Sequence, residues 1–213
     1  MTYIASDFTP DDPEQYMFIV EKICEHRAWF DDFTWEDPVK RRVAANLHLA
    51  DAYSNGKIWE VYDVEPPGVT LAGIIVLNQV TLSIDAFCHF IFFDHKLAGK
   101  QAVCLDAARW AFSGPLQLEV LRVSIPTYAA MFCDWVRKRL GFRYEAEALL
   151  AGWLKKHPQS NPWLEKASSQ RKATKHKGKW HNAVQLSLTK QEFISNHGPL
   201  KAIDQHPSIG PER

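Results

Sequence analysis

The residues best suited to chemistry lie where an apolar segment, 84–93, leads through a short loop into an expected helix. The loop holds Lys96, Gly99 and Lys100, and the helix is expected to begin at Gln101. The first N–H groups of a helix lack helical partners and lie at the positive end of its dipole, so they can hold a phosphate. Gly99 permits close approach, and the lysines add charge. The same loop also suits an ordinary turn, since one glycine commonly joins a strand to a helix.

Two ionisable residues on the preceding strand are candidate general bases. Asp85 and His89 are four residues apart, so they share a strand face. An imidazole titrates near neutral pH and can accept a proton. Glu60, on an earlier predicted strand, is a further candidate base, and Tyr128 is a candidate proton donor. Structural alternatives stay open, because His89 among Phe residues also suits a hydrogen-bonded core histidine, and Tyr128 also fits an apolar helix stripe.

Other histidines raise the question of a metal site. Asp94 and His95 are adjacent, and three more histidines follow at positions 157, 176 and 181. Neither set has the ligand spacing of a zinc site, so we predict no metal.

Apolar periodicity predicts the elements that position these residues. Asp12–Pro13 and Asp37–Pro38 combine an N-cap with proline at the first helical position, and each predicts a helix start. Asn55–Gly56 is expected to end the second helix with a left-handed glycine. The result is a mixed α/β sheet in one domain, 1–195. The pattern predicts strands at 57–64, 69–80, 82–93, 116–125 and 180–188, helices at 101–112 and 126–141, a basic loop insertion at 155–179 and a tail at 196–213.

Composition limits the class of protein. The 213 residues are 46% hydrophobic and carry no net charge, so no overall field attracts nucleic acid or a membrane. The four cysteines form no CxxC pair, and the N-terminus lacks a signal-peptide pattern. We therefore expect a reduced cytoplasmic protein without a membrane span and without a nucleic-acid partner. The basic stretch 155–179 suits a solvated loop, or contact with an acidic partner or a phosphate.

Three segments together resemble the GNAT family of N-acetyltransferases. The loop Lys96-Leu97-Ala98-Gly99-Lys100-Gln101 lies where the family has its pyrophosphate loop. The segment 129–142, ending in FCDWVRKRLGF, is similar to the family's fourth helix. The segment 177–193 is similar to a closing strand in the branch that modifies protein N-termini and small amines. The aromatic strand and the Pro126 helix entry resemble GNAT-like proteins of bacteriophages.

The resemblance implies a splayed sheet and acetyl-CoA as co-substrate, without a metal. Backbone groups near Phe92 and Phe93 would meet the pantetheine arm, and Asp85 lies where some members place a catalytic glutamate. Apart from the resemblance, Tyr128 at the start of the following helix could supply the proton for the departing thiolate. The acceptor would be a primary amine of a small molecule or a protein. The pyrophosphate would contact Lys96, Ala98, Gly99, Lys100 and Gln101.

Some positions differ from the family pattern. Gln101 replaces a small residue, Ala129 or Ala130 stands where an asparagine is common, and Arg137 replaces the usual tyrosine acid. A second hypothesis is therefore a GNAT fold without catalysis, acting as a binding or virion-associated protein. An oligomer is possible, and a phage origin would place the chain in the host cytoplasm or the virion.

Overall fold

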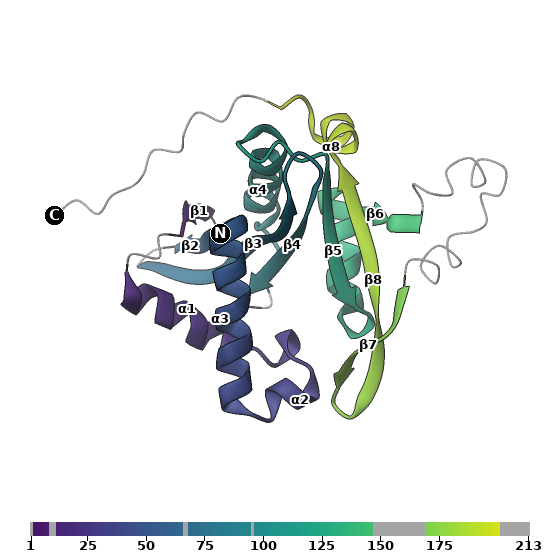
Figure 1. The fold of residues 1–213 in the computed structure, drawn as a ribbon. Coiled ribbons are helices and arrows are strands. Elements are labelled where there is room, and N and C mark those ends of the chain that lie inside the picture. Colours follow the sequence, from purple (N-terminus) through teal and green to yellow (C-terminus); the bar gives the residue numbers. More distant parts are fainter. Residues whose placement is uncertain (1, 9–11, 66–67, 95, 147–168, 201–213) are drawn as a thin grey trace.

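The centre of the molecule is one mixed sheet of eight strands (Figure 1). The computed structural model describes residues 2–8, 12–65, 68–94, 96–146 and 169–200. The strands are β1 Tyr3–Asp7, β2 Lys57–Glu65, β3 Gly68–Thr81, β4 Asp85–Phe92, β5 Val120–Pro126, β6 Arg143–Tyr144, β7 Ser169–His176 and β8 Lys179–Thr189. Their order is β1-β2-β3-β4-β5-β8-β6, with β7 paired to β8. The β4–β5 pair is parallel and the others are antiparallel, so the expected mixed α/β fold is confirmed.

Two helix starts follow the predicted capping chemistry. The side chain of Asp12 accepts hydrogen bonds from the N–H groups of Glu14 and Gln15. Asp37 caps the helix that begins at Pro38 in the same way. The helices are α1 Pro13–Glu25, α2 Asp32–Trp35, α3 Pro38–Asn55, α4 Gln101–Ser113, α5 Ala130–Trp135 and α8 Lys190–His197, with single 3-10 turns η1 Arg27–Trp29 and η2 Thr127–Ala129 and a π-helical turn η3 Val136–Leu140. No helix in these described ranges is long and apolar enough to cross a membrane.

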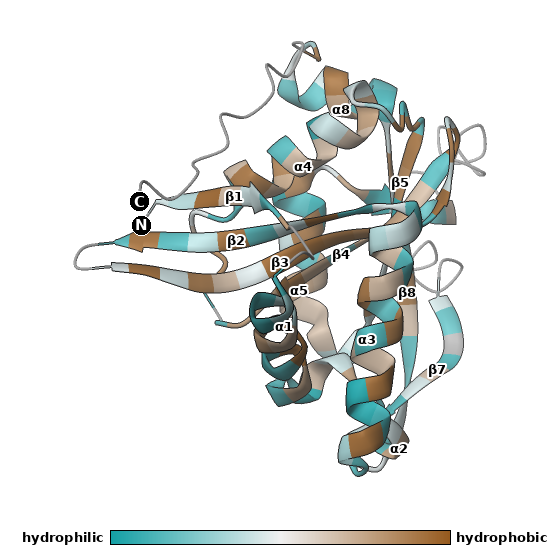
Figure 2. Ribbon diagram, turned by 60° about the vertical axis from the view of Figure 1, so that its left-hand side comes forward, coloured by the Kyte–Doolittle hydropathy of each residue, from teal (hydrophilic) through white to brown (hydrophobic). Residues whose placement is uncertain are grey.

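The helices cover the sheet from two sides, each with its own core. Helices α1 and α3 lie against one face, and α4 lies against the other (Figure 2). Ile74, Val76 and Ile91 belong to the α1–α3 core, whereas Ile75 and Phe90 belong to the α4 core. Strand β2 is buried on both faces near its start, where a half-buried strand was predicted. Successive side chains of the central strands therefore pack against helices on opposite faces of the sheet.

The β4–β5 pairing is short. Three residue pairs join these strands, from Asp85–Val120 to Phe87–Arg122. Beyond them β4 continues to Phe92 beside β3, and β5 continues to Pro126 beside β8. The two strands therefore diverge, as the resemblance implied.

Several predicted boundaries were wrong. Residues 82–84 form a turn before β4, and 116–119 precede β5 rather than belonging to it. The predicted basic insertion includes strand β7, while 155–168 lie outside the described residues. Helix α8 spans Lys190–His197, across the domain end expected at 195, and it begins at a reciprocal capping box formed by Thr189 and Glu192. Residues 201–213 of the predicted tail also lie outside the described residues.

Gly56 ends α3 for a reason other than the predicted left-handed cap. Its φ is −143°, which lies outside the left-handed region. A Cβ built there would lie 1.9 Å from the carbonyl oxygen of Leu77 on β3. Close packing of the helix end against the sheet therefore requires glycine.

Candidate active site

The divergence leaves backbone groups of β4 facing away from β3. The N–H of Phe93 donates to the carbonyl of Ala72 at 2.8 Å, so Phe93 pairs toward β3. Backbone groups alternate in direction along a strand, so the N–H and C=O of Phe92 point toward the β5 side. The β4–β5 pairing ends at Phe87–Arg122, so it supplies Phe92 with no partner. An extended ligand could pair with this edge as a further strand would.

The loop after β4 brings a helix start beside this edge. Asp94 accepts a hydrogen bond from the N–H of Lys96 at 2.9 Å, which folds the loop back. Gly99 has a φ of +84°, a left-handed conformation that favours glycine. Lys100 stands at the N-cap of α4, and no side chain caps the helix there. The first N–H groups of α4 therefore suit an anion.

The side chain of Lys100 does not face the ligand side of this loop. It is completely buried, in an ion pair with Asp94, and donates to the carbonyl of Lys96 at 2.6 Å. Its ammonium also lies 5.1 Å from the ring of Tyr3 and 4.6 Å from that of Phe92. The charge predicted for the phosphate instead anchors the loop to the sheet, and Lys96 is exposed.

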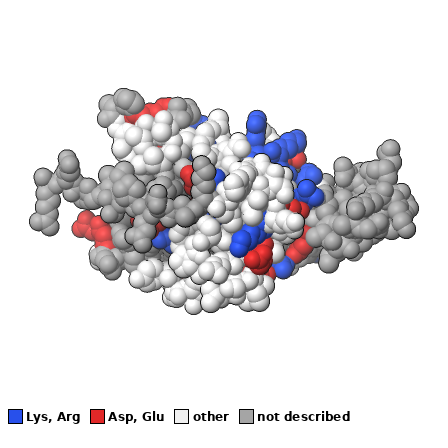
Figure 3. Space-filling model, turned by 90° about the horizontal axis from the view of Figure 1, so that it is seen from above, with Lys and Arg blue, Asp and Glu red and all other residues white. Residues whose placement is uncertain are grey.

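A basic hollow that the sequence did not reveal lies near the same helix start. The side-chain amide of Gln101 donates to the carbonyl of Arg139 at 3.0 Å, so the end of η3 adjoins the start of α4. On the face seen from above, a group of Lys and Arg side chains lies together at the upper right (Figure 3). Sequence patterns missed the hollow because its position depends on helix packing. A hollow of about 530 Å³ is lined by Arg137, Lys138, Arg139, Gly141, Phe142, Arg143, Asn196 and His197.

His89 lies on the opposite face of β4, in a polar cluster. Its Nε2 is 3.0 Å from Oδ1 of Asn78, and Nδ2 of Asn78 is 3.2 Å from Nδ1 of His48. The rings of Trp29 and His48 are 4.7 Å apart, edge to face. Desolvation and the neighbouring His48 lower the pKa of His89 to about 3, and desolvation lowers that of His48 to about 4. The sequence had suggested that His89 titrates near neutrality, whereas its burial and the neighbouring imidazole of His48 favour the neutral ring.

Asp85 is not brought together with His89. Its carboxylate pairs with Nε of Arg122 at 2.8 Å, and Arg122 also pairs with Glu145. Asp85 stands at the closed end of the β4–β5 pair, four residues or about 13 Å along the strand from His89. A carboxylate held by a guanidinium at the closed end is a poor candidate for a base that must reach the open end.

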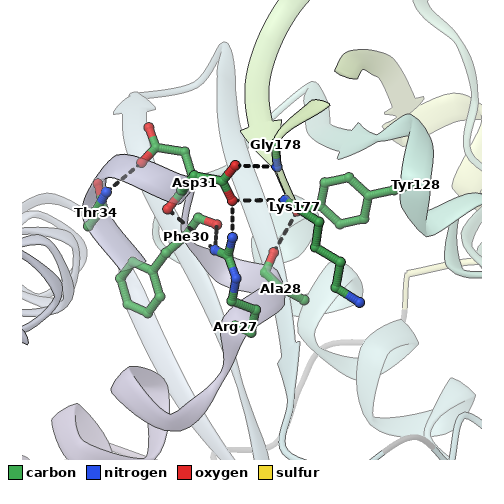
Figure 4. Close-up of polar contacts among 9 residues, drawn as sticks. Arg27, Ala28, Phe30, Asp31, Thr34, Tyr128, Lys177 and Gly178 are labelled. Atoms are coloured by element: carbon green, nitrogen blue, oxygen red, sulfur yellow. Dashed lines mark hydrogen bonds and ion pairs between the residues drawn. The ribbon is translucent and has the colours of Figure 1, made fainter. Parts of the chain in front are cut away.

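Tyr128 lies between two segments that are distant in the sequence. Its hydroxyl donates to the carbonyl of Ala28 at 2.8 Å (Figure 4). Its ring stacks on that of His176, with 4.2 Å between the ring centroids. Desolvation raises the pKa of Tyr128. The hydroxyl proton of Tyr128 is thus donated to the carbonyl of Ala28. This hydrogen bond must break before the phenol can protonate a thiolate.

A clasp beside Tyr128 joins α2 to the turn between β7 and β8. The carboxylate of Asp32 accepts hydrogen bonds from the N–H groups of Lys177 at 2.8 Å and Gly178 at 2.7 Å. Arg27 pairs with the same carboxylate and donates to the carbonyl of Phe30 (Figure 4). We call Arg27, Asp32, Lys177 and Gly178 the α2–hairpin clasp.

The remaining candidates are placed elsewhere. Glu60 is buried and engaged by Gln15 and Tyr62, on β2, two strands away from β4. His176 and His181 lie near Tyr128, and His95 and His157 lie outside the described residues. Within the described part of the chain, no three His, Cys, Asp or Glu side chains are grouped as a metal ion would require.

Solved structures of acetyltransferases share this arrangement of elements. Spermidine N-acetyltransferase from Vibrio cholerae, in complex with CoA and spermine, matches with a TM-score of 0.61 at 12% identity, over 91% of this chain and 98% of that one. A probable acetyltransferase matches with a TM-score of 0.58 at 16% identity, over 90% and 94%. The chain has the GNAT acetyltransferase fold. No protein-family model and no curated protein matches the sequence.

Proposed function

We propose that this protein is an N-acetyltransferase that moves an acetyl group from acetyl-CoA to a primary amine. The observation that carries the proposal is the open edge of β4 at Phe92, next to the uncapped start of α4. Together they offer one surface for an extended amide-containing chain and one for a phosphate, which are the two ends of such a co-substrate.

The residues of this chain would divide the binding as follows. Backbone groups of Phe92 would bond the pantetheine amides, whereas the N–H of Phe93, expected from the resemblance to take part, already donates to Ala72 of β3. The N–H groups of Ala98, Gly99 and Gln101 would hold the pyrophosphate, with the exposed Lys96 as counter-charge. Lys100 would contribute less, because its side chain is buried and its N–H donates to the carbonyl of Leu97 at 3.3 Å. The basic hollow beyond Gln101 would suit the remaining phosphate of the nucleotide.

Acetyl-CoA supplies the activated thioester carbonyl when it is bound. A backbone N–H at the open edge of β4 can donate to the developing oxyanion. His89 lies on the other face of β4, where an acceptor amine could approach without crossing the phosphate side. Asp85 and Tyr128 are less suited to proton transfer, because Arg122 and Ala28 already engage them.

The acceptor is assigned as a class, a primary amine of a small molecule or of a protein. The Vibrio cholerae neighbour was solved with spermine, a small amine, and its fold supports an amine acceptor here. In this chain the acceptor side would be bounded by η1, α2 and the β7–β8 turn, and the α2–hairpin clasp joins α2 to that turn.

A second candidate function is binding without catalysis, including a phage-like virion-associated role. One observation favours it. Arg137, at the position of the usual tyrosine acid, bonds the hydroxyl of Tyr144 at 3.0 Å and stacks on its ring. This side chain provides no proton for a thiolate.

Calorimetric titration with acetyl-CoA, beside free CoA, tests the proposal. Micromolar binding followed by release of CoA thiol with an amine panel is the expected result. Suitable amines are polyamines, aminoglycosides and peptide N-termini. Binding without thiol release would favour the second function, and no binding at millimolar co-substrate would contradict both the cofactor site and the activity.

A further inference from the structure

A single amide joins the two histidines on the α1–α3 face of the sheet. Asn78 of β3 contacts Nδ1 of His48 from α3 and Nε2 of His89 from β4. The two imidazole rings are 4.6 Å apart and almost perpendicular. Asn78 is buried, with 3% of its surface exposed, so water cannot easily replace either contact.

In the orientation that the structure gives it, the amide sets which ring nitrogens carry protons. Its Nδ2 group can only donate, so Nδ1 of His48 must be an unprotonated acceptor. Its Oδ1 can only accept, so Nε2 of His89 must carry a proton. A neutral imidazole carries one N–H, which leaves Nδ1 of His89 with a free lone pair.

The free nitrogen faces away from the amide. Asn78 stands on β3, so Nε2 of His89 is directed toward β3. The two nitrogens of an imidazole point in diverging directions, which turns Nδ1 toward the side where β4 and β5 separate. No donor among the described residues reaches that nitrogen, and His89 is half-buried rather than sealed.

The surroundings keep His89 uncharged. Asn78 from β3 and Trp29 from η1 carry no charge. His48 from α3 disfavours the protonated form of His89. Asp51, one turn beyond His48, favours the charged form of His48 alone. Asp85 is matched by Arg122. His89 is therefore a hydrogen-bond acceptor at neutral pH and a weak base.

We propose that His48 and Asn78 are positioning residues that present Nδ1 of His89 to an N–H of the uncharged acceptor amine at the divergence of β4 and β5. The protein then selects the free-base form of its acceptor instead of deprotonating an ammonium ion. The inference rests on the proposed function and adds the protonation state of the substrate.

The transfer balances without a strong enzyme base. The nitrogen lone pair of the amine forms the C–N bond to the thioester carbon, and the C–S bond breaks with its electron pair going to sulfur. The proton displaced from nitrogen ends on that sulfur. Neutral amine and thioester thus give amide and thiol with no net proton release. Nδ1 of His89 aligns the amine through its N–H, which fixes the direction of the lone pair.

The pH dependence of kcat/KM tests this selection. Two acceptors are compared, an alkylamine from the panel and its β-fluorinated analogue, which is much less basic. We expect the acid limb of the profile to move with the basicity of the acceptor. A limb at the same pH for both amines would reveal an enzyme base and overturn the proposal.

Variants at Asn78 test the positioning role. Asn78→Leu should lower kcat/KM by about tenfold or more. The acid limb of its pH profile should still shift with the basicity of the acceptor. Asn78→Asp places a carboxylate beside both rings and should add an ionisation of the enzyme that is the same for both amines. Asn182→Leu, which removes an exposed amide on β8, is the matched control. It should change neither kcat/KM nor the shape of the pH profile. Wild-type behaviour in both Asn78 variants would refute the role.

A spectroscopic measurement separates this inference from the proposed function. Long-range nitrogen–proton NMR of histidine-labelled wild-type protein reports each tautomer without any turnover. The proposal requires the Nε2–H form for both His48 and His89. An Nδ1–H form of His89 would overturn it even if acetyl transfer is established. If no amine is acetylated and acetyl-CoA does not bind, the proposed function fails and the catalytic role of His89 falls with it.

Discussion

The carboxylate of Asp32 in α2 accepts a 2.7 Å hydrogen bond from the backbone N–H of Gly178, which is 146 residues further along the chain. The same carboxylate receives the N–H of Lys177, so one side chain satisfies both donors at the tip of the β7–β8 hairpin. Lys177 and Gly178 have φ values of +49° and +78°, which form a tight turn whose N–H groups point outward. The clasp therefore depends on a carboxylate at this position.

Replacing Asp32 should release the hairpin. Asp32→Asn cannot accept two N–H groups and pair with Arg27 as a carboxylate does, so we expect Tm to fall by several degrees and hydrogen exchange to rise at 175–181. Asp31→Asn is the control, since Asp31 caps α2 at Thr34 and has no contact with the turn. Equal exchange in the two variants would show that the clasp does not hold the hairpin.

The same contact predicts a pH dependence of stability. The N–H of Gly178 holds the pKa of Asp32 below its ordinary value of 3.8. A lowered folded-state pKa means that the stabilisation is present above 3.8 and is lost as the pH falls through the lower folded value. The difference in Tm between wild type and Asp32→Asn should therefore be constant near neutral pH and shrink below about pH 4. A difference that stays constant into acid would contradict the linkage.

Substitution of Gly99 tests the phosphate loop. Gly99→Glu should weaken acetyl-CoA binding by about 100-fold or more, because the new carboxylate would face the pyrophosphate. Gly99→Ala carries the same cost of a left-handed backbone without the charge, and its Kd should stay within about tenfold of wild type. Calorimetry provides both values. Similar losses in the two variants would point to backbone strain alone and against a phosphate at the loop.

The buried ion pair predicts unequal effects of its two partners. Asp94→Asn leaves the completely buried ammonium of Lys100 without a counter-ion and should cost about 3–5 kcal/mol of unfolding free energy. Lys100→Met should cost less, because a third of the Asp94 side chain is exposed and its charge can remain hydrated. Urea denaturation of both variants measures the difference. Equal losses would argue that the lysine is not buried in solution.

Gly56 should tolerate no side chain. Gly56→Ala places a methyl group against the carbonyl of Leu77 and should cost about 3 kcal/mol or more. Gly68→Ala, at a position with nothing within 4 Å of the added Cβ, should change stability by less than about 1 kcal/mol. Thermal unfolding of the pair gives the comparison. A Gly56→Ala variant as stable as wild type would mean that α3 does not end against β3 as described.

Local patterns in the sequence determined a large part of the fold. Asp12 and Asp37 each precede proline, and that chemistry alone starts α1 and α3. Apolar alternation located β2, and runs of strand character located β3 and β8, all within a few residues, because strand burial is a property of successive side chains. The Gly99 loop was placed correctly between β4 and α4, since a glycine with a positive φ interrupts both periodicities. The resemblance to the GNAT fold added the splay between β4 and β5.

The tertiary structure alone decided which side chains meet. Lys100 was expected to face a phosphate, but Asp94 and the rings of Tyr3 and Phe92 make a buried site for its charge. Asp85 and His89 share a face of β4, yet Arg122 engages one and Asn78 the other. Strand β7 was missed because its basic sequence resembles a loop, and its pairing comes from β8. Sequence spacing determines the face on which a residue lies, whereas its partner and protonation state depend on neighbours that folding brings from elsewhere in the chain.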